Sequence, residues 1–366
     1  MKILNVVGAR PNFMKIAPIQ REMKKYPQLQ PLLIHTGQHY DEKMSKLFFD
    51  DLELPQPDVY LGVGSGTHAQ QTARIMVEFE KVIEQQRPDL VLVVGDVNST
   101  MACSIVASKM GVKIGHVEAG LRSFDRTMPE EINRLVTDAL ADFLFVTEKS
   151  GLQNLEREGI SAEKIYFTGN VMIDSLVYYM EKAKGSDILK RMNLNGYPYA
   201  LITLHRPNNV DIKENFEKLL DAFAVIQKDL KIVFPIHPRS LKMLHSFGLG
   251  SRIESMKNLL MIDPVGYLDF MQLMRQARLV LTDSGGIQEE TTYLRIPCLT
   301  MRENTERPVT VNVGTNIMVG SDTQCIINES TKIIHHDTKS GKIPELWDGH
   351  AAERIVKILA ESGKIG

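Results

Sequence analysis

Short apolar runs alternate with longer amphipathic segments through the first part of the chain. The apolar runs are Ile3–Val7, Leu32–His35, Leu90–Val94, Lys113–Val117 and Phe143–Val146. Uninterrupted runs of this length predict strands that are buried on both faces, as in a parallel sheet. The segments between them carry apolar residues at helical spacing, which predicts helices over Asn12–Tyr26, His68–Gln86 and Ser99–Met110. This alternation is typical of an α/β fold in which helices connect parallel strands.

A second series of apolar runs begins near residue 200. Its members are Ala200–Leu204, Ile232–Pro235, Leu259–Ile262, Leu279–Leu281 and Cys298–Met301. Between the two series, Asn170–Tyr199 combines a helical stretch with glycine- and proline-containing turns, a composition typical of a hinge. The pattern therefore predicts two Rossmann-like domains, 1–170 and 171–350, facing a central cleft. The last segment, 351–366, is predicted to be a helix that packs back on the first domain.

The composition supports a two-domain protein and narrows the classes of ligand. At 366 residues and 41.3 kDa, the chain is too long for one ordinary core. A formal net charge of −2 creates no overall field that would attract nucleic acid or an anionic membrane. The three cysteines have no metal-ligand spacing, which indicates reduced thiols. No apolar run approaches the roughly 20 residues of a membrane span. We therefore expect a cytoplasmic protein without a metal, a membrane contact or a nucleic-acid partner.

The stretch from Leu279 to Glu290 predicts a phosphate-binding turn. An apolar strand is followed by Ser284, Gly285 and Gly286 and then by a helical segment. Such a turn leaves backbone N–H groups unpaired at the positive end of the helix dipole, where phosphate binds well. Glu290 lies one helical turn further on, where a carboxylate can accept bonds from ribose hydroxyls. An ordinary helix start capped by Ser284 explains this stretch equally well on its own.

Two cations near the start of the chain predict a second anion contact. Arg10 and Lys15 belong to the motif Gly8-Ala-Arg-Pro-Asn-Phe-Met-Lys15, in which Pro11 suits the first turn of a helix. Cations are unfavourable at a helix start unless an anion binds there. We therefore expect Arg10 and Lys15 to meet a diphosphate, although a solvated pair at a helix start is the simpler alternative.

Acidic residues follow three successive elements of the first domain. Asp96 ends a predicted strand, Glu118 lies between a strand and a glycine turn, and Glu131 lies in the first turn of a helix set by Pro129. Each alone is most simply explained as a helix cap or a dipole partner. Three such residues at one end of the same domain, however, indicate acid–base chemistry.

The second domain offers further candidates after its strands. His205 is expected to donate to a phosphate, because it follows a strand and has Arg206 beside it. Phe270 either lines a base pocket or fills the core, and Arg307 follows a strand and is expected near Ser284. His237 is a second histidine at a strand end, with a less defined role.

Together these motifs resemble those of the non-hydrolysing UDP-N-acetylglucosamine 2-epimerase family. The resemblance covers nearly the whole chain and rests on the ordered set GARPNFMK, TGQHYD, VVGDVNST, GHVEAGLRS, MPEEINR, LHRPNNV, TDSGGIQEE and NTERP. Each motif is common, whereas their order is specific. The resemblance implies a fold like that of the GT-B glycosyltransferases, a homodimer, and an activity without a metal or another cofactor.

The resemblance also implies roles for individual residues. The residues expected to hold the UDP moiety are Arg10, Lys15, His205, Phe270, Ser284, Gly285, Gly286, Glu290 and Arg307. Asp96, Glu118 and Glu131 match the acidic catalytic positions, and His205 is expected to act on the leaving diphosphate.

Two positions depart from the family pattern. Val265 stands where some relatives have a polar contact to the nucleotide. Tyr40 and Asp41 stand where some relatives have Arg-Gln and bind a second substrate molecule as an activator. The resemblance therefore does not extend to these two contacts.

The implied reaction is the reversible epimerisation of UDP-N-acetylglucosamine at C2, by elimination and re-addition of UDP. Three alternatives share the same nucleotide site: an epimerase of a related UDP-2,3-diacetamido sugar, a hydrolysing 2-epimerase, and a GT-B glycosyltransferase. A nucleotide-sugar sensor without catalysis is disfavoured, because it would have no use for the three carboxylates.

Overall fold

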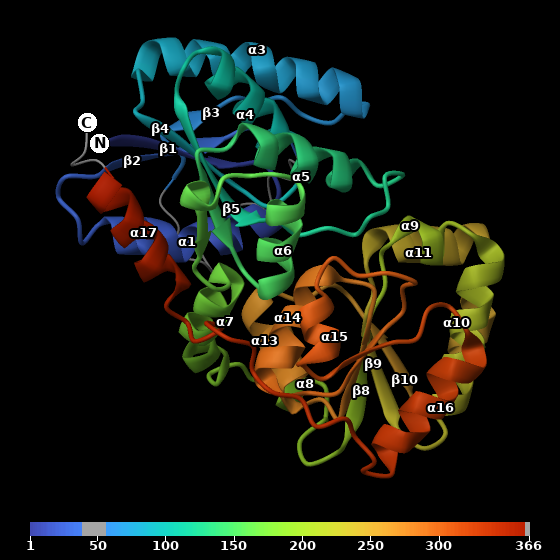
Figure 1. Cartoon of the computed structure of the whole chain (residues 1–366). Coiled ribbons are helices and arrows are strands. Elements are labelled where there is room, and N and C mark those ends of the chain that lie inside the picture. The colour runs from blue at the N-terminus through green and yellow to red at the C-terminus, as the bar shows by residue number, and fades with distance from the viewer. Residues whose placement is uncertain (39–55, 363–366) are drawn as a thin grey trace. The chain divides into compact units, whose positions relative to one another are not determined.

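The computed structural model describes residues 1–38 and 56–362 and divides the chain into two compact units (Figure 1). Unit 1 comprises Met1–Val177 and Glu345–Gly366, and unit 2 comprises Tyr178–Pro344. Each unit is a parallel sheet covered by helices. The structure therefore confirms the α/β fold that the alternating pattern predicts.

Unit 1 contains a seven-stranded sheet in the order β3-β2-β1-β4-β5-β6-β7. Its strands are β1 (Lys2–Val7), β2 (Gln30–His35), β3 (Val59–Tyr60), β4 (Leu90–Val94), β5 (Lys113–Ala119), β6 (Phe143–Val146) and β7 (Ile165–Phe167). Its helices are α1 (Arg10–Met23), α3 (His68–Gln86), α4 (Asn98–Lys109), α5 (Pro129–Leu140), α6 (Lys149–Arg157), the 3₁₀ turn η1 (Ala162–Lys164) and α17 (Ala351–Ser362). Helix α7 (Val171–Ala183) continues from unit 1 into unit 2.

Helices cover both faces of the unit 1 sheet. Helices α3, α4 and α5 pack side by side on one face, and α1 packs with α17 on the other (Figure 1). The central strand β4 reads Leu-Val-Leu-Val-Val, and all five residues are buried. A strand enclosed on both faces needs apolar residues at every position, which explains why its sequence does not alternate.

Unit 2 contains a six-stranded sheet in the order β10-β9-β8-β11-β12-β13. Its strands are β8 (Tyr199–Thr203), β9 (Lys231–Pro235), β10 (Leu259–Ile262), β11 (Leu279–Thr282), β12 (Cys298–Thr300) and β13 (Asn316–Met318). Its helices are α8 (Ile188–Arg191), α9 (Pro207–Val210), α10 (Lys213–Ile226), α11 (Pro238–Ser246), α12 (Gly250–Glu254), α13 (Tyr267–Gln276), α14 (Gly285–Leu294), α15 (Pro308–Asn312) and α16 (Thr323–Ile334).

The side chains of unit 2 strands form two cores, one on each face of the sheet. Successive strand residues point to opposite faces, so Ile202 joins one cluster and Leu201 joins the other. The first cluster also contains apolar residues of α10 and α16, and the second contains residues of α8 and α13. Figure 1 shows these helices on the two sides of the unit 2 strands.

The C-terminal segment is built into unit 1. Trp347 is buried, and its indole N–H donates to the carbonyl oxygen of Thr147 at 3.0 Å. Asp174 of α7 accepts bonds from the backbone N–H groups of Ala351 and Ala352, at 3.2 and 2.7 Å, where α17 begins. A carboxylate from another helix thus caps α17.

We expect Trp347→Ala to lower the free energy of unfolding of unit 1 by about 3–5 kcal/mol, because it leaves a large cavity and an unpaired carbonyl. Trp347→Phe should cost less, since most of the volume remains. Urea unfolding followed by circular dichroism measures both effects. Tyr197→Ala is the control, because that ring is 66% exposed. A loss below about 1 kcal/mol for Trp347→Ala would contradict the anchoring role.

Candidate active site

The candidates of unit 1 lie where the strand order of its sheet reverses. The chain runs from β1 outward to β2 and β3 and then returns to β4 on the other side of β1. In open α/β sheets, ligands bind at the carboxyl ends of the strands at such a switch point. Lys15 follows β1 on α1, and Asp96 follows β4 in the turn before α4. Both therefore belong to the end of the sheet where a ligand is expected.

Lys15 and Glu118 form a buried ion pair. Their side chains are only 7% and 4% exposed. A Cβ atom at Gly95 would lie 2.8 Å from the Nζ atom of Lys15, and the φ angle of Gly95 is +69°, so glycine suits both the backbone and the nearby ammonium group. The side chain of Arg10, the second cation expected here, lies outside the described part of the chain. In unit 1, Lys15 therefore meets a carboxylate of its own unit.

The backbone of Glu118 adopts an unusual conformation. Its φ angle is +76°, in the left-handed region that favours glycine. The pairing of β5 with β6 also shifts register between Val117 and Ala119. A bulge of this kind redirects a side chain, and its strain persists only where the surroundings fix it.

Arg134 links the other two carboxylates of unit 1. Its Nε and Nη2 atoms lie 3.0 and 2.9 Å from Oδ2 of Asp96, and its Nη1 atom contacts Oε2 of Glu131. The Asp96 side chain is 26% exposed, whereas those of Glu131 and Arg134 are buried. One guanidinium group is thus shared by a partly exposed carboxylate and a buried one, and its single positive charge offsets only one of the two negative charges.

Glu131 is also bonded to the loop that precedes α5. Its Oε2 atom accepts from the backbone N–H and the hydroxyl group of Ser123, both at 3.0 Å. Its Oε1 atom accepts from the N–H of Phe124 at 3.0 Å. With Arg134, this makes four donors on one carboxylate. The geometry indicates that Glu131 fixes the loop.

Unit 2 has its own switch point between β8 and β11. Asp283 follows β11 and is fully buried. It accepts bonds from the N–H groups of His205 and Arg206 and from the amide of Asn209. The Nδ1 atom of His205 lies 2.9 Å from the Asp283 carboxylate. Asp283 thus holds the loop after β8 and orients the imidazole of His205.

The charge state of Asp283 follows from these contacts. Burial alone would raise the pKa of Asp283, but bonds and charge from His205, with two backbone N–H groups, hold this pKa below its ordinary value. Asp283 engages Nδ1 of the His205 ring and not Nε2, and the His205 side chain is 38% exposed.

Ser284, Gly285 and Gly286 form the start of α14. Ser284 is the N-cap residue of α14, as an ordinary helix start requires, but its side chain makes no capping bond to the helix. A Cβ atom at Gly285 would lie 2.7 Å from Nη1 of Arg307, which shows that the guanidinium group reaches this helix start. Arg307 is held there by Glu289 at 2.7 Å and by Glu306 at 2.5 Å.

Glu290 is buried on the same helix, and the Tyr267 hydroxyl donates to it at 3.0 Å. Burial raises the pKa of the Glu290 carboxyl to about 7; the Tyr267 bond opposes this shift, and the charge of Glu289 adds to it.

A hollow of about 640 Å³ lies beside the ends of β9 and β10 in unit 2. Its walls are mostly apolar and include Ile236, Met261 and Val265, with Arg191 and Asp269 at its edge. Phe270 packs against the neighbouring core cluster and does not line the hollow.

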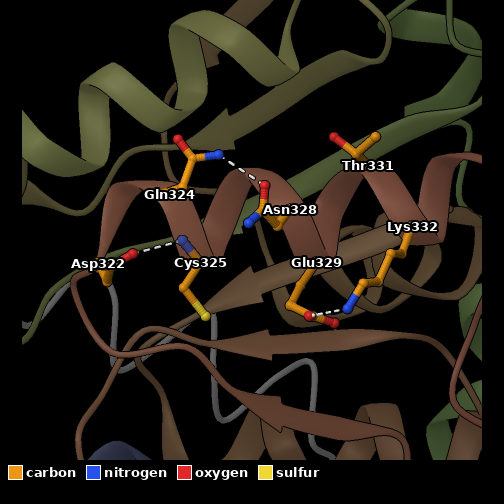
Figure 2. Close-up of a pocket in the computed structure, with 7 residues that line it drawn as sticks. All are labelled: Asp322, Gln324, Cys325, Asn328, Glu329, Thr331 and Lys332. Atoms are coloured by element: carbon orange, nitrogen blue, oxygen red, sulfur yellow. Dashed lines mark hydrogen bonds and ion pairs between the residues drawn. The ribbon is translucent and has the colours of Figure 1, made fainter.

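A second hollow of about 580 Å³ is a surface feature of α16 (Figure 2). Its lining side chains all come from this helix and its cap residue Asp322. Figure 2 shows bonds along the helix between some of them, as between Lys332 and Glu329 and between Gln324 and Asn328. Nothing in this arrangement selects a ligand.

Comparison with known proteins identifies the family. The sequence model described as UDP-N-acetylglucosamine 2-epimerase matches residues 21–360. The chain belongs to the UDP-N-acetylglucosamine 2-epimerase family. A protein of that name from Methanocaldococcus jannaschii is 43% identical over 365 residues, which cover 98% of this chain and 99% of that protein.

A solved structure and one further relative from this 2-epimerase family bear on the ligand. The solved structure of the M. jannaschii UDP-GlcNAc 2-epimerase in complex with UDP-GlcNAc and UDP matches 99% of this chain and 100% of that one, with 43% identity and a TM-score of 0.91. The UDP-2,3-diacetamido-2,3-dideoxy-D-glucuronate 2-epimerase of Pseudomonas aeruginosa is 39% identical over 364 residues, covering 99% of this chain and 100% of that protein.

Some sequence predictions concern absences or undescribed residues. Tyr40 and Asp41, which depart from the 2-epimerase pattern, lie outside residues 1–38 and 56–362. Within those ranges, no group of three or more His, Cys, Asp or Glu side chains is placed to hold a metal ion. None of the helices in the described parts is long and apolar enough to span a membrane.

The partners of the predicted site residues were not identified from the sequence. In the sequence, the position of Arg134 is typical of a cation on a helix surface, and the position of Asp283 is typical of a residue at the end of a strand. The one available signal is position: Arg134 lies one helical turn after Glu131, and Asp283 directly precedes the Ser-Gly-Gly turn.

We expect Glu290→Gln to stabilise the ligand-free protein at pH 8 and to have little effect at pH 4.5. The pKa of Glu290 is about 7 in the folded chain, against about 4.3 in an unfolded chain. The folded state thus binds the proton more tightly, and its stabilisation is full below the unfolded pKa and is lost as the pH rises through 7. Thermal unfolding at several pH values measures the difference, and an effect that does not vary with pH would contradict it.

Proposed function

We propose that this member of the family interconverts UDP-GlcNAc and UDP-N-acetylmannosamine without a cofactor. The observation that carries the proposal is the near-complete match to a solved relative bound to UDP-GlcNAc and UDP. The acidic side chains near the strand ends of unit 1 and the helix start of unit 2, with Arg307 beside it, support it.

The chemistry of the substrate explains why such an enzyme needs these groups. The C2 hydrogen of the sugar is not acidic, because no carbonyl group lies next to it in the ring. If the C1–O bond to UDP breaks first, the oxocarbenium-like ring makes that hydrogen acidic. A base removes the proton, which gives 2-acetamidoglucal and UDP. Protonation of the opposite face of C2 and return of UDP to C1 give the epimer.

Unit 2 supplies groups that suit a leaving UDP. The N–H groups at Ser284, Gly285 and Gly286 and the guanidinium of Arg307 are proposed to bind the diphosphate. His205 is proposed to donate from Nε2, the ring nitrogen that Asp283 does not engage, to the leaving phosphate oxygen.

Further contacts are proposed for the ends of the nucleotide. Glu290 would accept bonds from the ribose hydroxyls in place of Tyr267. The apolar hollow beside β9 and β10 suits the uracil ring, and Phe270 would support that hollow from the core. Arg10 and Lys15 are proposed as additional cations for the diphosphate. Lys15 would have to share its ammonium group with Glu118.

Unit 1 supplies groups that suit proton transfer at C2. Asp96 is partly exposed, and Glu118 has its carboxylate redirected by the bulge in β5. We propose these two as the proton-transfer groups. Glu131 is bonded by four donors, so we propose that it contributes by holding Arg134 and the loop after Leu121.

A related substrate is the second candidate, because a relative of 39% identity is named for a UDP-2,3-diacetamido uronate. The leaving UDP and the C2 chemistry would be the same for that sugar. A hydrolysing epimerase would instead release free sugar and UDP, and a GT-B glycosyltransferase would need an acceptor. The family resemblance also predicts a homodimer, which light scattering would test.

Incubation with UDP-GlcNAc alone in D₂O tests the reaction and its mechanism. We expect UDP-N-acetylmannosamine to form, with deuterium at C2 of the recovered UDP-sugars, because the base exchanges its proton with solvent. Mass spectrometry and NMR spectroscopy identify both. Epimer without deuterium would exclude the elimination mechanism. Turnover of the diacetamido uronate but not of UDP-GlcNAc would favour the second candidate.

We expect Glu118→Gln to lower kcat at least about 100-fold and to leave the Kd for UDP within about threefold, since an amide cannot accept the proton. Steady-state kinetics and calorimetry measure the two quantities. Glu163→Gln is the matched control, because Glu163 is an exposed residue of η1 in the same unit. Turnover by Glu118→Gln that equals the control would remove Glu118 from the mechanism.

A further inference from the structure

A buried histidine lies two residues before Glu118 on β5. The ring of His116 is fully buried, with Nδ1 at 2.6 Å from Oδ1 of Asp138 and Nε2 at 2.8 Å from the carbonyl oxygen of Gly95. Both partners are acceptors. The ring can satisfy both only when each of its nitrogen atoms carries a proton.

The carboxylate of Asp138 connects this ring to the backbone beyond Glu118. Its Oδ2 atom accepts from the N–H of Gly120 at 3.1 Å and from Nη1 of Arg122 at 2.7 Å. Arg122 in turn forms a two-point contact with Glu158, at 2.8 and 2.6 Å. The four charged groups therefore balance one another within the fold.

The charge of Asp138 is maintained by these partners. Complete burial alone would raise the pKa of Asp138, but the positive charges of His116 and Arg122 outweigh burial and hold this pKa below its ordinary value. A charged carboxylate is the form that can accept from all three donors.

His116 and Asp138 occupy specific positions relative to Glu118 and Asp96, the proposed proton-transfer groups. Asp138 bonds to the side chain two residues before Glu118 and to the backbone two residues after it, so it spans the bulge. Through His116, the same carboxylate is connected to Gly95, the residue before Asp96. The strained backbone of Glu118 needs surroundings that fix it, and these bonds supply them.

We propose that His116 and Asp138 are a positioning pair, which sets the placement of Asp96 and Glu118 for proton transfer at C2. This inference rests on the proposed function and adds residues that act through others. Neither side chain is placed to touch substrate, because both are fully buried.

Two substitutions of His116 separate its two bonds. His116→Asn provides an amide nitrogen near the place of Nδ1 and keeps only the bond to Asp138. His116→Gln provides one near the place of Nε2 and keeps only the bond to Gly95. Asp138→Asn places an amide N–H group opposite one of the donors whose hydrogen bonds the carboxylate accepts.

The matched control is Asp142→Asn. Asp142 lies just after α5, the helix that carries Asp138, and it also accepts a backbone N–H of β5, from Ile114 at 2.9 Å, but near the beginning of the strand. The same chemical change is thus made at the other end of β5.

We expect each of the three variants to lower kcat about 10- to 100-fold, since small displacements of catalytic groups have effects of this size. KM and the Kd for UDP should stay within about threefold, because most of the proposed UDP contacts belong to unit 2. Asp142→Asn should match the wild type in all three quantities. Folded variants with wild-type kcat would overturn the proposal, as would equal losses in the control.

The protonation of His116 provides a test that does not depend on variants. In the wild-type protein with ¹⁵N-labelled histidine, NMR spectroscopy should show protons on both ring nitrogens of one solvent-protected histidine at pH 7. Absence of either proton would overturn the pairing. Failure of the wild type to epimerise UDP-GlcNAc would instead count against the proposed function, while the NMR result would still test the pair.

Discussion

A carboxylate buried in a protein must be matched by positive charge or by N–H groups, and this requirement organises the strand ends of both units. In unit 1, Arg134 forms ion pairs with Asp96 and Glu131, and Lys15 forms one with Glu118. In unit 2, Asp283 is satisfied by the loop after β8. Because the donors belong to loops and helix starts, neutralising the charge also fixes the backbone. The parallel sheets supply the positions, and the carboxylates determine the conformations there.

The two units differ in the charged groups that they hold near their strand ends. Unit 1 combines three carboxylates with two cations, and one of those carboxylates, on Asp96, remains partly exposed. Unit 2 brings donor groups to its strand ends: the start of α14 with Arg307 beside it, and the ring of His205. A division between acid-rich and donor-rich units suits a reaction in which one part of the substrate exchanges a proton and another departs as an anion.

The sequence predicts the fold well wherever strands are long and apolar. The runs at Leu90–Val94 and Leu259–Ile262 are strands within the same bounds in the structure. The short strand β3, of two residues, has no run from which it could be recognised. At the candidate site, motifs identify the residues, but their partners depend on tertiary contacts. Asp138 lies 22 residues from His116, and nothing in the local pattern connects them.

The anchoring of the C-terminal segment has a spectroscopic consequence. Trp347 is the chain's single tryptophan. It belongs to the C-terminal segment, which follows the whole of unit 2 in the sequence but is part of unit 1, where Trp347 is buried. Emission excited selectively at tryptophan therefore reports the environment of unit 1 alone. Unit 2 remains silent in that signal, so a fluorescence transition and a transition of total helix content measure different parts of the molecule, and any separation between them would resolve the two units without a label.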